Sequence, residues 1–185
     1  MAETTLWNID PAHSAVEFAV KHMMFTTVRG RFRDFTGTIE VDERNPDRSK
    51  VSVEIAAASI DTGVADRDTH LKSPDFLDAE HHPSLTFRSK RIEGAMKKEG
   101  DRFRVIGDLT IRGRTIEVTL DCEYEGTGTD PWGGTRSGVR ATTKIDRREW
   151  GLQWNQALET GGILVANEVR IELEVQAVKA VPVTA

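Results

Sequence analysis

Apolar and polar residues alternate along most of this 185-residue chain, and this pattern constrains its fold more than any other feature. Successive side chains of a β-strand point to opposite faces of the sheet, so alternation predicts strands with one apolar and one charged face. In residues 165–175, for example, Ile171 and Leu173 alternate with Arg170 and Glu172. The same pattern predicts strands at residues 14–22, 26–33, 35–42, 51–55, 85–87, 103–111, 116–122, 139–145 and 165–175.

Strands with one charged face are typical of an antiparallel sheet that has one side in water. Many such strands joined by short turns favour either a β-sandwich or a closed barrel. Gly30, Gly37 and Gly107 fall on the apolar side of their strands, where glycine usually marks a bulge, a bend or a close backbone approach. Because strands that bend to close a barrel use such positions, we predict an all-β, antiparallel barrel of about eight strands.

Residues 60–83 interrupt the alternation and predict the one helical segment of the chain. Asp66 is expected to cap a short helix, and Ser73 to cap a second turn with Pro74 at its first position. A single helical excursion in a β chain is expected to plug or cover one end of the barrel. Its apolar side would consist of Leu71, Phe76 and Leu77.

Two glycine-containing stretches predict tight turns between strands. In Arg112-Gly113-Arg114, the glycine can adopt the positive φ that a tight hairpin tip requires. The stretch DPWGGTRSG, residues 130–138, lacks the lysine and the strand–loop–helix context of a phosphate-binding loop. We therefore expect it to be a hairpin loop with Trp132 as an aromatic anchor.

Length and composition favour a single globular domain, and residues 179–185 are expected to form a frayed tail. Hydrophobic residues make up 38% of the chain and charged residues 30%, as in ordinary soluble proteins. The net charge of −5 argues against nucleic acid as a partner, because non-specific nucleic-acid binding needs a positive field.

The sequence also bears on where the protein works. Residues 1–10 contain neither a basic stretch nor an apolar one, so they do not resemble a signal peptide. No segment approaches the roughly 18 apolar residues of a membrane-spanning helix. Cys122 is the one cysteine, which excludes an intramolecular disulfide. We predict a cytoplasmic protein that does not insert into membranes.

The candidate catalytic residues have simpler structural explanations. His70, His81 and His82 lie near one another in the sequence but follow no zinc-binding spacing. Cys122 falls in the apolar row of its strand, which favours an inert core cysteine. The aspartates of residues 61–78 lie where turns and helix starts use them as caps. We therefore predict no catalytic residue, no metal site, no cofactor and no enzymatic activity.

The barrel interior is the remaining candidate site. A barrel of about eight strands is either filled with side chains or holds one small ligand, and both alternatives share the same alternation. Composition alone leaves this choice open. His22 continues the inward row of Val16, Phe18 and Val20, where it could be a satisfied polar residue at the end of a core or part of the polar mouth of a pocket.

Six motifs in sequence order carry a resemblance to a known family. They are DPAHSAVEFAVKHM, TVRGRF, DTGVADRDTHLKSPDFLDAEHHPSLTFRS, GDLTIRGRT, DPWGGTRSG and WGLQWN. Together they resemble the YceI-like family, the polyisoprenoid-binding, lipocalin-like proteins of bacteria. The resemblance extends from about Leu6 to Val178. It implies an elongated, lipocalin-like antiparallel β-barrel with a helical segment at one end, an apolar tunnel and a homodimer.

The function implied by the resemblance is non-enzymatic binding, transport or storage of a polyisoprenoid or another long-chain amphiphilic lipid. An enzyme or isomerase that acts on such a lipid is the alternative, and a module with a filled core that acts through its surface is a third. If the barrel is hollow, the following residues are expected to contact the lipid: Val16, Phe18, Val20, His22, Val28, Phe32, Phe35, Ile39, Val53, Ile55, Phe76, Phe87, Leu109, Leu120, Trp132, Trp154, Val169 and Ile171.

Overall fold

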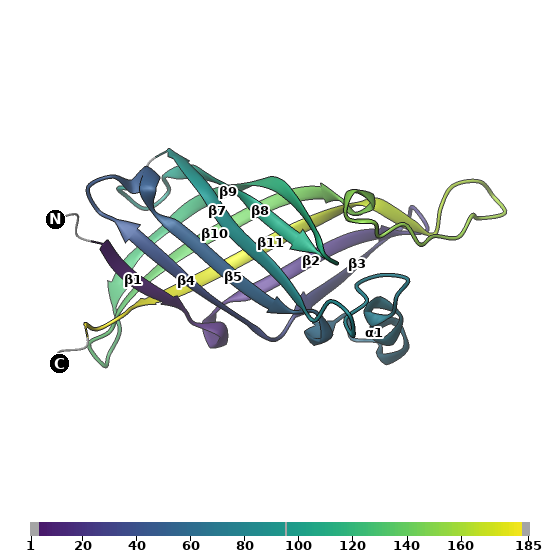
Figure 1. Ribbon diagram of the computed structural model, residues 1–185, viewed down its shortest axis with the longest axis horizontal. Helices are drawn as coiled ribbons and strands as arrows, with labels where there is room; N and C mark the ends of the chain where they lie inside the picture. Colours follow the sequence, from purple (N-terminus) through teal and green to yellow (C-terminus); the bar gives the residue numbers. More distant parts are fainter. Residues whose placement is uncertain (1–3, 95, 183–185) are drawn as a thin grey trace.

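The computed structural model describes residues 4–94 and 96–182, which form an elongated body made almost entirely of strands (Figure 1). Four short 3₁₀ turns and one α-helix connect the strands. The strands are β1 (Thr4–Ile9), β2 (Ala15–His22), β3 (Thr26–Phe32), β4 (Phe35–Asp42), β5 (Lys50–Ala56), β6 (Ile60–Asp61), β7 (Ser84–Gly94), β8 (Arg102–Ile111), β9 (Arg114–Thr129), β10 (Thr135–Asp146) and β11 (Val165–Lys179). The helix is α1 (Ala65–Lys72), and the 3₁₀ turns are Pro11–His13, Pro46–Arg48, Ala57–Ser59 and Arg147–Trp150.

The strands form one antiparallel sheet that closes on itself. Its order is β1-β4-β5-β7-β8-β9-β10-β11-β2-β3-β6, and an additional pairing of β1 with β11 completes the ring. The ring contains 8 strands, and β2, β3 and β6 continue the sheet from the edge of β11. The prediction of a closed antiparallel barrel of about eight strands is therefore confirmed.

Two successive strands, β1 and β2, pair with different stretches of the same strand, β11. β1 pairs with β11 between Ala177 and Lys179, whereas β2 pairs with β11 from Val165 to Glu174. A 3₁₀ turn separates the two strands because Pro11 has no backbone N–H to donate to the ladder. The β2–β3 hairpin consequently extends the barrel beyond β1 and β4, toward the end where α1 lies (Figure 1).

Arg136 attaches the 3₁₀ turn at Pro11–His13 to the β9–β10 hairpin. Its guanidinium lies 2.7 Å from Asp10 Oδ2 and 2.8 Å from Asp130 Oδ2. The hydrogen bond from Arg136, with a second from His13, lowers the pKa of Asp10 to about 2. Asp10 therefore stays charged at neutral pH and holds the turn against the barrel wall.

Both predicted hairpins are present. Arg112 and Gly113 form a two-residue loop with φ of 50° and 74°, and Ile111 pairs with Arg114 across it, which confirms the predicted tip. Residues 130–134 connect β9 to β10, but Trp132 is 86% exposed, so its expected role as an anchor is wrong. The Asp130 carboxylate orders that loop instead, because it accepts hydrogen bonds from the backbone N–H groups of Trp132 and Gly134.

The helical segment covers one end of the barrel, as expected, although its caps differ from the prediction. The N-cap of α1 is Val64, and Asp66 lies inside the first turn. Ser73 is the C-cap of α1, and residues 74–77 form a turn instead of a second helix. The Ser73 hydroxyl donates to the carbonyl of His70 at 2.6 Å, which closes α1, and it accepts only a long bond of 3.3 Å from the backbone N–H of Asp75, where the chain forms a turn.

Gly107 of β8 allows an unusually close approach of β7. A Cβ at this position would lie 2.5 Å from the carbonyl oxygen of Arg88 and 2.8 Å from the Cα of Ser89. The pairing of β7 with β8 also shifts by one residue between Ser89 and Arg91, which is a β-bulge. The glycines on apolar strand faces thus mark close contacts, as their positions in the sequence predicted.

We expect Gly107→Ala to destabilise the protein by about 1–3 kcal/mol, because the backbone atoms that the new methyl group meets cannot rotate away. Gly128→Ala is the matched control, since a Cβ there meets no atom within 4 Å. That substitution should be neutral or slightly stabilising, because alanine restricts the unfolded chain. Urea unfolding of both variants measures the difference, and equal effects would contradict the close approach.

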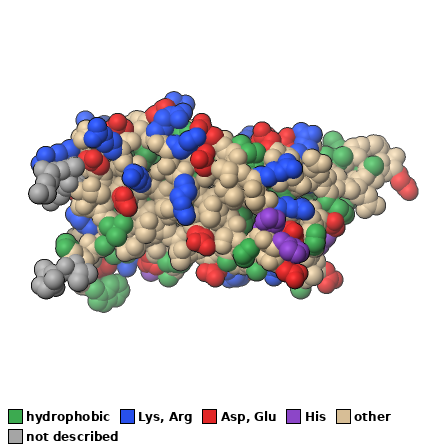
Figure 2. All heavy atoms as spheres, viewed as in Figure 1, with side chains coloured by type: hydrophobic (Ala, Val, Ile, Leu, Met, Phe, Trp, Pro, Cys, Tyr) green, Lys and Arg blue, Asp and Glu red, His purple; other side chains and the backbone are tan. Residues whose placement is uncertain are grey.

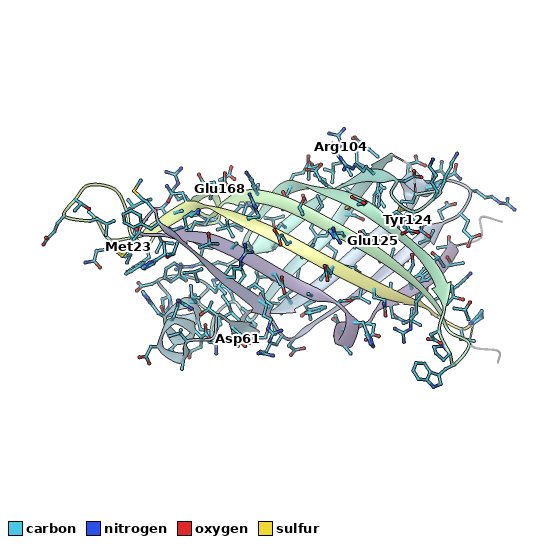
Figure 3. All side chains as sticks on the ribbon, turned by 180° about the vertical axis from the view of Figure 1, so that it is seen from behind. Met23, Asp61, Arg104, Tyr124, Glu125 and Glu168 are labelled. Atoms are coloured by element: carbon cyan, nitrogen blue, oxygen red, sulfur yellow. The ribbon has the colours of Figure 1, made fainter. Side chains whose placement is uncertain are left out.

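The outer surface is charged with both signs. Figure 2 shows Lys, Arg, Asp and Glu side chains mixed along one face of the barrel. On the opposite face, exposed ion pairs join neighbouring strands, such as Arg140 with Glu125 and Lys144 with Glu168 (Figure 3). Glu125 and Glu168 are labelled on the outer face in Figure 3. Within the described ranges, no helix is long and apolar enough to cross a membrane.

The start of β1 and the end of β11 lie at the barrel end opposite α1 (Figure 1). β11 continues to Lys179, which pairs with Trp7, and the backbone N–H of Ala180 donates to the carbonyl of Leu6 at 2.7 Å. The first residues of the expected tail are therefore attached to β1. The last part of that tail, residues 183–185, lies outside the described residues.

Candidate ligand-binding cavity

A cavity of about 430 Å³ occupies the inside of the barrel. This volume falls within the roughly 300–1,000 Å³ of typical small-molecule pockets. The inward rows of neighbouring strands line it, for example Val139, Ala141 and Ile145 of β10. Because the strands alternate inward apolar residues with outward charged ones, closing the sheet brings every apolar face to this cavity.

Several side chains that face the barrel axis are only partly buried, which favours a hollow barrel over a filled one. Phe18, Val53, Leu109 and Val169 line the cavity and pack against the core, yet each remains half-buried. In a close-packed interior, inward apolar residues of this kind would lose nearly all of their accessible surface. The choice that composition left open is therefore resolved in favour of a hollow barrel.

Most residues that the sequence analysis assigned to ligand contact lie on the cavity wall. They come from every part of the chain and are brought together by closure of the sheet. The residues found there are Val16, Phe18, Val20, Phe32, Phe35, Ile39, Val53, Ile55, Phe76, Phe87, Leu109, Leu120, Val169 and Ile171.

Four assigned residues lie elsewhere. His22 and Val28 do not line the cavity, although the residues that they pair with, Val165 and Val20, do. Trp132 is exposed at the tip of the β9–β10 loop. Trp154 packs on the helical segment, with its ring 4.6 Å from that of His70 and outside the cavity lining.

The last turn of α1 and the residues after it form a lid over one end of the cavity. Leu71, Phe76 and Leu77 all line the cavity, and the last two are 7% exposed. Arg112 of the β8–β9 hairpin donates a hydrogen bond to the carbonyl of Phe76 at 3.0 Å, which attaches the lid to the barrel. This arrangement confirms the expected apolar side of the helical segment.

The opposite end of the cavity has a polar rim. Small hydroxyl side chains line it where the chain termini and the β9–β10 hairpin meet, together with the exposed carboxylate of Glu43. These hydroxyl residues are Thr5, Ser49, Thr127 and Ser137. The cavity thus extends from a polar rim at one end to a closed apolar lid at the other.

Arg147 is the functional candidate that the sequence analysis missed. It lines the cavity beside the lid and is only 4% exposed, whereas the other charged residues of the lining, Glu17, Glu43 and Glu174, are exposed. Burial lowers the pKa of Arg147 because desolvation disfavours the charged guanidinium, and Asp146 acts in the opposite direction. The sequence pattern could have predicted that Arg147 points inward, because residue 147 continues the inward row of residues 139, 141, 143 and 145.

The cavity offers few groups for chemistry on a ligand. Burial raises the pKa of Cys122 to about 12, so its thiol is a poor nucleophile at neutral pH. Within the described part of the chain, no cluster of three or more His, Cys, Asp or Glu side chains could hold a metal ion. The arrangement is suited to enclosing an apolar molecule.

Comparison with solved structures supports the same architecture. The barrel superposes on the crystal structure of Burkholderia cenocepacia BcnA with a TM-score of 0.77 and 24% identity, covering 91% of this chain and 98% of that one. A structure described as a polyisoprenoid binding domain from Saccharophagus degradans gives a TM-score of 0.69 and 12% identity, covering 94% and 98%. At these identities, the similarity concerns the fold.

Sequence comparison is more specific. Protein YceI of Escherichia coli O157:H7 is 42% identical over 141 residues, which covers 76% of this chain and 72% of the relative. Residues 7–177 match the YceI-like domain family, including all of the strands that carry the cavity wall except the ends of β1 and β11. On this evidence the chain belongs to the YceI-like domain family.

Proposed function

We propose that this protein binds a polyisoprenoid or a related long-chain amphiphilic lipid inside its barrel and carries or stores it without altering it. The observation that supports this proposal most strongly is the apolar cavity that reaches from the polar rim to the lid. The description of the Saccharophagus degradans structure as a polyisoprenoid binding domain agrees with it. Residues 6–178 would form the single lipid-binding domain.

The energetics of such binding require little polar recognition. Burial of each methylene contributes about 0.8 kcal/mol, so a chain of a dozen carbons gains enough to offset the loss of its freedom. The inward residues found on the wall would supply this apolar contact. The alternative, an enzyme that acts on the lipid, requires converging acid–base groups, and the inward wall presents almost entirely hydrocarbon.

Lipid should therefore co-purify with the protein. Gentle purification, followed by native mass spectrometry and by organic extraction with mass spectrometry, is expected to reveal one long-chain lipid per barrel. The same extraction of protein that was unfolded and washed before analysis provides the control. Protein that carries no lipid and takes none up from added polyprenol would contradict the proposal, whereas chemical turnover of a bound lipid would support the enzyme alternative.

Two further expectations belong to this proposal, the homodimer that the family resemblance implies and the cytoplasmic location expected from residues 1–10. We propose that the protein acts as a homodimer and that it works in the cytoplasm. Light scattering coupled to size exclusion measures the first, and fractionation of the source cells measures the second.

A further inference from the structure

We propose that Arg147 is the binding site for an anionic head group of the lipid, and that the lipid is therefore oriented with its head beside the lid. This inference rests on the proposed function and specifies the ligand class that the cavity takes. The head group is identified by its chemistry, a carboxylate or phosphate attached to a long apolar chain.

The first support is the direction of the side chain. Residue 147 follows Ile145 in the inward row of β10, and its side chain lines the cavity. The guanidinium carbon lies 6.0 Å from the ring centroid of Phe76, which is the apolar centre of the lid. Arg147 thus places a positive charge where the apolar cavity meets its closed end.

The second support is the charge balance around this guanidinium. No Asp or Glu of the described residues forms an ion pair with Arg147, and the neighbouring Asp146 is bound instead by Arg148 at 2.6 Å. A buried charge is costly unless it is paired and hydrogen-bonded. An anion in the cavity would supply the missing charge partner.

The third support is the donor count. Nε donates to the carbonyl of Ala166 at 2.9 Å, and Nη1 donates to those of Leu152 and Trp154 at 2.6 and 3.0 Å. Nη2 has one long contact of 3.4 Å, to the carbonyl of Val165. A guanidinium has five N–H donors, so Nη2 retains a donor for which the described residues provide no acceptor. These backbone carbonyls fix the plane of the guanidinium and leave that donor for a ligand oxygen.

A matched pair of probes tests the head-group preference on the unmodified protein. After delipidation, hexadecanoate is expected to bind at least about tenfold more tightly than hexadecanol, since hydrogen bonds to ionised groups are roughly twice as strong as neutral ones. Equal affinity for the two probes would overturn the inference while leaving the proposed function intact. Failure of both probes and of polyprenol to bind would overturn both.

Variants then assign the preference to Arg147. Arg147→Lys should keep part of the preference for hexadecanoate, and Arg147→Met should abolish it while hexadecanol still binds. Arg148→Met is the control, because that exposed side chain is paired with Asp146 on the surface. If Arg147→Met folds but weakens both probes equally, the residue has only a structural role and the inference fails.

A measurement of lipid orientation decides the question even if Arg147→Met does not fold. Trp150 and Trp154 flank the Arg147 site, whereas Trp7 lines the cavity near the other end. In protein labelled with fluorotryptophan, stearate with a nitroxide near its carboxylate should broaden the Trp150 and Trp154 fluorine signals most. A nitroxide near the methyl end should broaden Trp7 most, and the reverse pattern would overturn the inference.

Discussion

Trp150→Ala is expected to lower the free energy of unfolding by about 3–5 kcal/mol, the largest loss of stability that we predict for this protein. Trp150 is 1% exposed and is the largest fully buried side chain of the described residues. Its indole Nε1 donates a hydrogen bond of 3.0 Å to the carbonyl of Leu109, so it connects the 3₁₀ turn after β10 to the wall of β8. The substitution leaves a void and removes this hydrogen bond, and urea unfolding monitored by circular dichroism measures their cost.

Trp132→Ala provides the matched control, because it removes the same side chain from an 86% exposed position. Its effect should remain within about 0.5 kcal/mol, as for most surface substitutions. Comparable losses from the two variants would mean that the β9–β10 loop contributes to the core after all. The pair thus also tests the finding that Trp132 does not act as an anchor.

The barrel could be predicted from the sequence because its determinants are local and repeated. Alternation along residues 165–175 identifies both a strand and its inward face, and Gly107 indicates a close strand contact without reference to any other residue. The tight turn at Arg112 and Gly113 depends only on these two residues, which adopt the positive φ that such a turn requires. Such features do not depend on which strands become neighbours.

The features that the sequence could not predict depend on non-local geometry. His22 shares a strand face with Val16, yet on β2 the cavity lining ends at Val20, and alternation gives no sign of where along a strand the cavity ends. Trp154 follows a glycine turn, and its place against His70 depends on how the lid packs. Whether the barrel is hollow depends on its closed circumference, which alternation does not encode.

Arg147 was difficult to predict for a different reason. Its inward position could have been extrapolated from the row of β10, yet a charged residue in an apolar row looks like the end of a strand. The carbonyls that accept from it belong to residues 152, 154, 165 and 166, which come together only when the loop after the 3₁₀ turn folds back. A polar residue is therefore tolerated inside the barrel because of partners that the pattern cannot show.

Ala141→Trp is expected to remove most of the bound lipid while leaving the barrel stable. Ala141 lines the middle of the cavity and pairs with Leu173 and Cys122, which line it as well. An indole at this position occupies space that the lipid chain would fill. Exclusion of about three methylenes from the wall costs about 2.4 kcal/mol, or roughly fiftyfold in affinity. The lipid content after purification and the affinity for added polyprenol measure this loss.

Thr142→Trp is the control for Ala141→Trp, since the neighbouring side chain is exposed on the outer face of the same strand. It should keep full lipid content and an unchanged melting temperature. The stability of Ala141→Trp separates the two kinds of barrel, because overpacking of a filled core costs about 1–3 kcal/mol or more whereas a hollow one accommodates the ring. A variant that is strongly destabilised would show a core packed solid at residue 141, and a stable variant that retains its lipid would show that the ligand does not occupy the barrel.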